Sequence, residues 1–228
     1  MTDNFNFTDE RFADIQMLRY RLDDFDNLTL NQKLYIYYLS EATLCGRDIT
    51  TDQFCRYNLR IRRTLEAVYV NYFGERDCDE FRALTVYLKR VWFSNGIHHH
   101  YGCEKFVPDF TEDYFRSVVL TTSTDIASKV GVDQHFNLPL VADETVEALL
   151  DDICPVIFNQ KIMAKRVNQK ARDDLVATSA CNYYEGLTQK EVENFYAKMR
   201  EDDADNAATP ISYGLNSTLR KTSEGCVK

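Results

Sequence analysis

The chain has 228 residues, of which 44% are hydrophobic and 28% charged, a composition typical of one folded domain or two small ones. Its 27 basic and 36 acidic residues give a net charge of −9, which argues against a nucleic-acid partner because phosphate backbones are bound by concentrated Lys and Arg. The densest basic cluster is expected to be a solvated helix surface and consists of Arg56, Arg60, Arg62 and Arg63.

The sequence has no run of about 18 apolar residues, so we predict no transmembrane helix and no membrane partner. The polar start MTDNFNFTDERF differs from a secretory signal, which begins with a charged stretch followed by an apolar one. Seven cysteines are scattered without a CxxC pair, which is not the pattern of a disulfide framework. We therefore expect a cytoplasmic protein with reduced thiols.

The first predicted element is a short strand over residues 15–22, where Leu18, Tyr20 and Leu22 share one side. A helix follows over residues 30–45, ended by Gly46. Its expected N-cap is Thr29, and the side chains expected on its buried face are Leu34, Tyr37, Tyr38 and Leu44.

Two further helices are predicted, one from Thr51 to about Phe73 and one from about Asp79 to Phe93. Gly74 is expected to stop the first, and the Asn95-Gly96 pair to end the second. The side chains expected to point inward are Phe54, Asn58, Ile61, Leu65, Val68 and Tyr72 on the first helix, and Phe81, Leu84, Leu88 and Val91 on the second.

Thr111 is expected to start another helix that runs through about Leu120, and residues 121–140 read as a connection with at most a short helical turn. Residues 142–153 are predicted to be helical until Pro155 bends or ends the helix. Next come an irregular basic segment over residues 161–172 and a segment over residues 174–184 that is apolar enough to be buried.

Thr188 and Glu191 form a predicted capping box at the start of a helix, and a polar loop is expected over residues 201–210. Residues 211–221 have strand character because Ile211, Tyr213 and Leu215 alternate with polar residues. This strand has no evident neighbour, so its partners would come from residues 15–22, from another chain or from sequence that is absent. The pattern is that of a chain cut from a longer one.

The stretch VWFSNGIHHHYGCEKFVP, residues 91–108, holds three of the four histidines. In an extended loop His98 and His100 would point the same way and could share one metal ion, with Cys103 as a third ligand after a turn at Gly102. The competing interpretation is a loop in which one histidine packs, one bonds a backbone carbonyl and one faces water.

Signatures of hydrolysis are missing from the sequence, since it contains no HExxH, no GxSxG and no Gly-rich phosphate loop. Cys103 lies close to His100, but no third residue can be named to orient such a nucleophile and base. Tyr101 and Phe106 are candidates for lining a groove, with packing inside the loop as the alternative. No catalytic residue is predicted.

Several long strings occur in collinear order: FADIQMLRY, LTLNQKLYIYYLSEATLCGRDI, RYNLRIRRTLEAVY, VYLKRVWFSNGIHHHY, KFVPDF, AKRVNQ, NYYEGLTQKEVENFY and ISYGLNSTL. Together they resemble the N-terminal third of the bacterial type of the dipeptidyl peptidase III family. The members of this family are zinc exopeptidases that release dipeptides from the N-termini of oligopeptides. The resemblance covers nearly the whole chain.

The resemblance implies that residues 1–228 form a single region, the lower lobe of a two-lobed hydrolase. Its expected fold class is α+β, predominantly α-helical, with the start of a small β-barrel at the C-terminal end. The family holds its zinc on an HExxGH helix and a following glutamate in the other lobe, and no position of this chain matches them. We therefore expect no bound zinc and no catalysis by this chain alone.

The resemblance also implies two partners, an oligopeptide substrate and the remaining C-terminal lobe of the same enzyme. The loop GIHHHYGCEKF would lie at the lower wall of the substrate cleft, where rings and imidazoles offer a stacking area and adaptable hydrogen bonds. The candidate cleft residues are Asn95, His98, His100, Tyr101 and Phe106.

Two alternatives remain open at the level of the sequence. One is a stand-alone helical module that binds peptides or proteins. The other is a small metal-binding protein that uses His98, His100 and Cys103. The dipeptidyl peptidase III interpretation further predicts exposed hydrophobic surface near residues 211–228, where other strands would pair.

Overall fold

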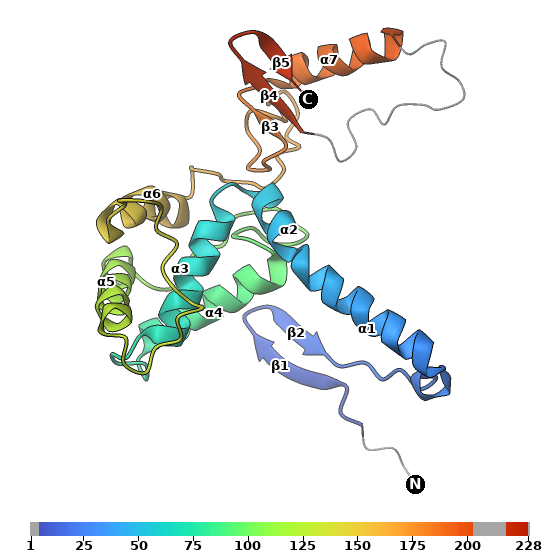
Figure 1. Cartoon of the computed structure of the whole chain (residues 1–228). Helices are drawn as coiled ribbons and strands as arrows, with labels where there is room; N and C mark the ends of the chain where they lie inside the picture. Colours follow the sequence, from blue (N-terminus) through green and yellow to red (C-terminus); the bar gives the residue numbers. More distant parts are fainter. Residues whose placement is uncertain (1–4, 203–217, 228) are drawn as a thin grey trace.

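The structure is a computed structural model and describes residues 5–202 and 218–227. The fold is mainly helical (Figure 1). The helices are α1 (Leu30–Cys45), α2 (Arg47–Phe54), α3 (Asn58–Asn71), α4 (Asp79–Ser94), α5 (Glu112–Ser128), α6 (Val146–Phe158) and α7 (Gln189–Asp202), with a 3-10 turn at Phe25–Asn27. The strands are β1 (Thr8–Phe12), β2 (Ile15–Leu18), β3 (Tyr184–Glu185), β4 (Leu219–Thr222) and β5 (Gly225–Val227).

The predicted fold class, predominantly helical α+β, is confirmed. The described part of the chain forms two small sheets, β1-β2 and β3-β4-β5, and neither closes into a barrel. Across the same residues, none of the helices combines the length and the apolarity that crossing a bilayer requires.

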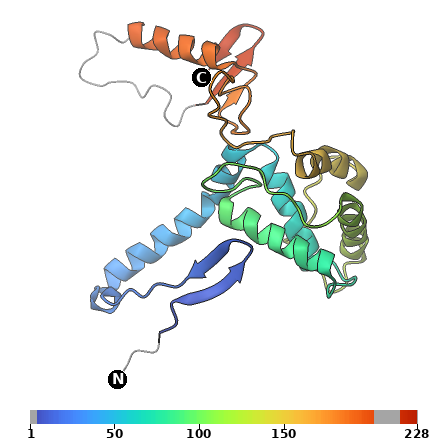
Figure 2. The ribbon, with the colours of Figure 1, turned by 180° about the vertical axis from the view of Figure 1, so that it is seen from behind.

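The main core lies between α3, α4, α5 and α6, which stand together in both views (Figures 1 and 2). The apolar stripes predicted for α3 and α4 face this core, since Ile61, Leu65, Leu84 and Leu88 are fully buried. Phe115 from α5 fills its centre. Helical spacing of apolar residues therefore predicted this part of the fold correctly.

The long helix predicted from Thr51 to Phe73 is wrong, because the structure divides it into α2 and α3. Cys55 is fully buried and extended, with φ −171° and ψ 133°, so the chain turns there between the two helices. Thr51 lies buried inside α2, which already begins after Gly46. The predicted buried stripe is still correct, because almost all of its residues lie on α3.

The helix predicted to end near Leu120 continues to Ser128, so the connection predicted over residues 121–140 is wrong in its first part. Threonines there donate their hydroxyl protons to carbonyls one turn back, as Thr122 does to Val118 at 2.8 Å. Because this bond satisfies the hydroxyl locally, a run of hydroxyl residues can stay helical with Thr122 buried.

Pro155 lies inside α6 and does not end it, since the helix continues to Phe158. Proline cannot donate the usual helical hydrogen bond, which costs stability. Ile153, Val156 and Ile157, on either side of it, are buried in the main core. We infer that this apolar burial offsets the lost hydrogen bond.

The bounds predicted for the first helix are confirmed, but its predicted buried face is wrong. Thr29 accepts a hydrogen bond from the backbone N–H of Gln32, whose side chain returns to the backbone of Thr29, so α1 has a complete capping box. No residue of α1 is buried, and the predicted inner face is exposed along the helix, which projects from α2 (Figure 1). The exposed residues of that face are Leu34, Tyr37, Tyr38 and Leu44.

The strand predicted over residues 15–22 is confirmed only as β2, and it pairs with β1, a strand that the sequence did not predict. The hairpin contacts α4 through ion pairs between Lys89 and Glu10 and between Arg90 and Asp14, the latter at 2.8 Å. Ile15 is the one buried residue of the two strands, so the hairpin is held on α4 mainly by surface contacts.

Trp92 lies where the hairpin meets α4. Its indole N–H donates to a carboxylate oxygen of Glu66 at 2.7 Å, and its ring meets the Tyr69 ring edge-on at 5.9 Å. Phe12 and Met17 of the hairpin line the same shallow pocket as Trp92. The indole is thus held on one side by α3 and borders the hairpin on the other.

The C-terminal elements form a second, smaller unit. The capping box predicted for α7 is confirmed, since Thr188 N donates to Glu191 at 2.8 Å. Residues 161–172 are irregular, as predicted, but the segment 174–184 is mostly half-buried, with Ala180 buried and Leu175 exposed. Its small core consists of Leu187, Val192, Tyr196 and Leu219.

The strand predicted over residues 211–221 is described from residue 218 onward, and the alternation of residues 211–215 lies outside the described residues. The described part forms β4, which pairs in parallel with β3 and antiparallel with β5. The expectation of a strand without neighbours is therefore wrong. Leu219 is buried rather than part of an exposed apolar edge.

The side-chain amide of Asn58 joins three parts of the fold. It is fully buried, donates to the carbonyls of Thr51 at 3.0 Å and Asn95 at 3.4 Å, and accepts from Ile97 N at 3.2 Å. Gly96, at φ +150°, passes so close that an added Cβ would lie 2.1 Å from the Asn58 amide nitrogen. The end of α4 is fixed against α2 and α3 by this contact.

We expect Asn58→Ala to lower the free energy of unfolding by about 3 kcal/mol, because it leaves buried backbone groups unpaired. Urea titration measures the change. The matched control is Asn31→Ala on exposed α1, which is expected to change stability by less than about 0.5 kcal/mol. Equal effects of the two substitutions would contradict the structural role of Asn58.

Candidate functional site

The loop that follows α4 is the candidate site. It begins at Asn95, whose left-handed conformation, φ 53°, ends the helix as predicted. His98 and Lys105 then form an isolated antiparallel bridge, and Phe106 N donates to the carbonyl of Ile97 at 2.9 Å. The loop is therefore a short hairpin-like turn with a defined conformation.

His98 is a structural residue at the base of this loop. It is 1% exposed, and its Nε2 lies 2.7 Å from the carbonyl oxygen of Met163. Since a carbonyl only accepts, Nε2 carries the proton and donates it. Burial lowers the pKa of His98 to about 4, so the ring stays neutral. A residue in this position cannot face substrate, which corrects one of the cleft candidates.

His99, His100 and Tyr101 form a row of adjacent rings at the tip of the loop, called the ring stack below. The two histidine rings are stacked, with 29° between their planes, and the Tyr101 ring is tilted by 48° against His100. The ring centroids lie 4.4 Å apart between the two histidines and 4.5 Å apart between His100 and Tyr101. Tyr101 is 85% exposed, and the Phe93 ring meets His100 edge-on at 4.9 Å. This stack is the accessible aromatic surface of the loop.

His99 holds the stack in place through both ring nitrogens. Nδ1 accepts from the backbone N–H groups of Tyr101 at 3.2 Å and Gly102 at 3.1 Å, which leaves the proton on Nε2. Nε2 lies 3.5 Å from a carboxylate oxygen of Asp14 in the hairpin. Arg90 donates to the same carboxylate and lowers the pKa of Asp14.

Two candidate residues are internal rather than cleft-lining. Phe106 is only 4% exposed and belongs to the main core, so loop packing, the alternative that the sequence left open, is correct for it. The carbonyl of Asn95 is tied to Asn58, and its role is to end α4. The candidates that remain accessible are His100, which is half-buried, and Tyr101.

Lys105 anchors the loop to the end of α6. Its ammonium group is buried and donates to the carbonyls of Val156, Asn159 and Ile162, each at 2.6 Å. The last carbonyls of a helix lack partners inside the helix and carry partial negative charge, so an ammonium group there is favourable. All three of its protons are used.

Arg166 holds the other strand of the loop. Its guanidinium donates to the carbonyl of His100 at 2.9 Å and lies 3.5 Å from Cys103 Sγ, while its backbone N–H donates to the carbonyl of Cys103. The same guanidinium lies 4.5 Å above the Phe54 ring. The basic segment over residues 161–172 is irregular because its polar groups bind this loop.

The residues present do not fit a zinc site. Within residues 5–202 and 218–227, no three His, Cys, Asp or Glu side chains are grouped so that they could hold a metal ion. The Nε2 of His98 is engaged with Met163, and Cys103 Sγ lies against Arg166. The ligand set of His98, His100 and Cys103 is thus not assembled.

The basic cluster that the sequence assigns to a solvated surface is divided by the fold: Arg56 and Arg63 are exposed, as predicted, and Arg60 is half-buried. Arg62 is only 6% exposed, which makes that prediction wrong for it. The ion pairs of the cluster are Arg60 with Glu144 and Asp152, Arg62 with Asp48 and Glu66, and Arg63 with Asp48. These partners cancel most of the positive charge of the cluster.

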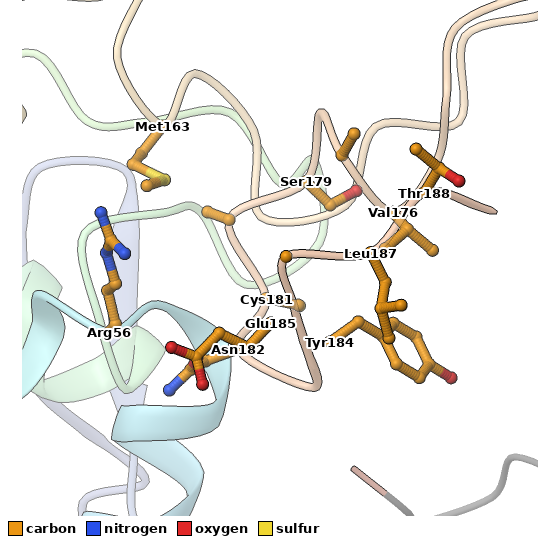
Figure 3. Close-up of a pocket in the computed structure, with 13 residues that line it drawn as sticks. Arg56, Met163, Val176, Ser179, Cys181, Asn182, Tyr184, Glu185, Leu187 and Thr188 are labelled. Atoms are coloured by element: carbon orange, nitrogen blue, oxygen red, sulfur yellow. The ribbon is translucent and has the colours of Figure 1, made fainter. Parts of the chain in front are cut away.

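A pocket of about 440 Å³ lies beside the loop (Figure 3). Arg56 and Met163 stand on one side of it and Tyr184 on the other, at the segment that precedes α7. Because the Met163 carbonyl also receives the His98 hydrogen bond, the pocket and the loop share one backbone segment. The pocket lining offers the Tyr184 ring and the Arg56 guanidinium, together with the polar side chains of Ser179, Cys181 and Glu185. An apolar and aromatic lining with a few polar groups is typical of a ligand-binding pocket.

No protein-family model matches the chain, and no curated protein matches it with significant similarity. Lys105, Arg166 and Asp14 were missed as site residues at the level of the sequence. A basic or acidic residue in a polar segment gives no signal of its partner, and each of these three reaches a partner far away in the chain.

We expect His98 to make the stability of the protein depend on pH. The unfolded imidazole protonates near pH 6.5, whereas the folded one stays neutral to about pH 4. Stability is therefore fully present above pH 6.5, and about 3 kcal/mol is lost as the pH falls to 4.

Urea titrations at a series of pH values test this expectation against His98→Gln, whose amide can still donate to Met163. The wild type is expected to lose about 3 kcal/mol more than the variant between pH 7 and pH 4. Parallel curves for the two proteins would show that His98 is not a buried neutral ring.

Proposed function

We propose that this chain is the N-terminal, lower-lobe part of a zinc-dependent dipeptidyl peptidase of the dipeptidyl peptidase III type. It supplies one wall of the peptide cleft and is inactive alone. The observation that carries the proposal is the collinear series of strings that resembles the family, above all VWFSNGIHHHYGCEKFVP. The helical α+β fold of the described residues is compatible with a lower lobe.

The geometry of the loop supports a role in peptide binding. The stack formed by His99, His100 and Tyr101 presents flat rings at a fixed position, because Arg166 and Asp14 hold its two sides. The exposed Tyr101 ring can pack on apolar side chains of a peptide, and the backbone and the His99 ring that carry it are already held in place.

A stand-alone protein-binding module is the second candidate function, and two observations favour it. The helix α1 exposes a long apolar surface. The strand β4 already has neighbours on both sides, so the sheet contains no edge at β4 that calls for further strands. A hydrolytic role and a binding role are separated by the following two experiments.

The first experiment measures zinc content and hydrolysis of a dipeptidyl-arylamide on one purified sample supplied with zinc. We expect neither stoichiometric zinc nor hydrolysis, because the chain contains no HExxGH motif. Zinc that binds in a 1:1 ratio and is lost in His100→Ala or Cys103→Ala would contradict this expectation. It would favour the small metalloprotein instead, and cobalt would then give a thiolate absorption band.

The second experiment follows the amide resonances of the chain by NMR during titration with an unlabelled tetrapeptide. We expect shifts centred on Tyr101 and Gly102, and a loss of about fivefold or more in affinity for Tyr101→Ala, because the exposed ring supplies contact area. The matched control is Tyr20→Ala, which removes another exposed tyrosine outside the loop. Shifts confined to other surfaces would contradict a cleft role for the loop.

A further inference from the structure

The helix α1 exposes apolar side chains all around its circumference. Their exposed fractions lie between 43% and 71%, in a helix without one buried residue. The exposed apolar residues are Leu30, Leu34, Tyr35, Ile36, Tyr37, Tyr38, Leu39 and Leu44. Contiguous apolar surface of this extent marks an interaction site rather than ordinary solvent-facing surface.

The helix also lacks the packing that normally keeps a helix of 16 residues folded. It continues into α2 at Gly46 and otherwise projects away from the main core in both views (Figures 1 and 2). Helices of this length are marginal in water unless they bury an apolar face. A surface that covers α1 would therefore stabilise the helix itself.

One face of α1 has its leucines and its two charged residues spaced symmetrically about Tyr37. Lys33 and Glu41 lie four residues before and after it, and Leu30 and Leu44 lie seven residues before and after it. At about 3.6 residues per turn these five side chains fall on one face of the helix. A two-fold axis at Tyr37 would bring each lysine against the glutamate, and each Leu30 against the Leu44, of an antiparallel copy.

We propose that α1 is a self-association surface that pairs antiparallel with α1 of a second copy of this chain. The pairing buries the two leucine contacts and places the two Tyr37 rings at the axis. It also forms two opposite-charge pairs between Lys33 and Glu41. A parallel pairing would instead place lysine against lysine and glutamate against glutamate, so charge selects the antiparallel arrangement.

The groups that this pairing needs are accessible. The carboxylate of Glu41 is exposed and has no ion-pair partner in the described chain. Lys33 is half-buried: it donates to the Asp26 carbonyl at 3.1 Å, and its ammonium lies 4.0 Å from the Asp26 carboxylate and 5.6 Å from the centre of the Phe25 ring. These contacts lie within the turn just before α1, and the pairing requires Lys33 to exchange them for Glu41 of the second copy. The helix is only about 24 Å long, so the interface is small and the association should be reversible.

Analytical ultracentrifugation of the 228-residue chain over a series of concentrations tests the proposal. We expect a monomer–dimer equilibrium. Lys33→Glu and Glu41→Lys should each raise the dimer dissociation constant about tenfold, because each makes both charge pairs repulsive. The matched control is Lys198→Glu, an exposed position on α7, which makes the same charge change as Lys33→Glu and should leave the equilibrium unchanged.

A second measurement mixes the two charge variants. The antiparallel orientation itself is tested by the single variants, because neither substitution would add a repulsive pair to a parallel dimer. In an antiparallel pair of Lys33→Glu with Glu41→Lys, both charge pairs become attractive, so the mixture should dimerise at least as well as the wild type. Circular dichroism confirms that each variant keeps its helix content. Monomers at every concentration, or mixing without restored association, would overturn the proposal and assign the α1 surface to a different polypeptide.

Discussion

The arrangement of the candidate site depends on one buried charge, the ammonium group of Lys105. Removing an ammonium from water is costly unless its protons are all bonded, and here three carbonyls accept them, in the last turn of α6, at its C-cap and in the segment just after it. The loop after α4 and the segment after α6 therefore meet at a fixed distance. His98, bound to Met163, and Arg166, bound to His100, extend the same contact, so the tip of the loop is positioned by side chains from outside it.

Local signals predicted the elements well because they act within a few residues. Thr29, Thr111 and the Asn95-Gly96 pair set helix ends by bonds to their immediate neighbours, and the structure confirms each of them. The errors arose where distant contacts decided the outcome. Burial of Val156 and Ile157 keeps a helix through Pro155, and burial of Cys55 interrupts a helix whose apolar spacing continues across it. The same spacing assigned Tyr37 and Tyr38 to a buried face, although nothing in the described chain covers them.

For the candidate site, the sequence singled out the loop after α4 but not the contacts that each of its histidines makes. Histidines in a row suggested a shared ligand set, whereas the structure assigns them separate environments: His98 inside, His99 between backbone N–H groups and Asp14, and His100 within a ring stack. The loop interpretation expected one packed histidine, one bonded to a backbone carbonyl and one facing water. His98 is both the packed histidine and the one bonded to a carbonyl. Neighbouring positions in a tight turn point in different directions, and only tertiary contacts decide which direction is inward.

The position of Trp92 makes its fluorescence a probe of the contact between the hairpin and α4. It is the single tryptophan in the sequence, it donates to Glu66 on α3, and it borders the β1-β2 hairpin through Phe12 and Met17. Its fluorescence therefore reports the environment at one seam, where two surface ion pairs and few buried residues hold the hairpin on α4. Trp92 is already 39% exposed, and lifting of the hairpin would expose the indole further while the main helical core stays closed. Salt, which screens those ion pairs, should thus shift the emission to the red before it changes the helical signal.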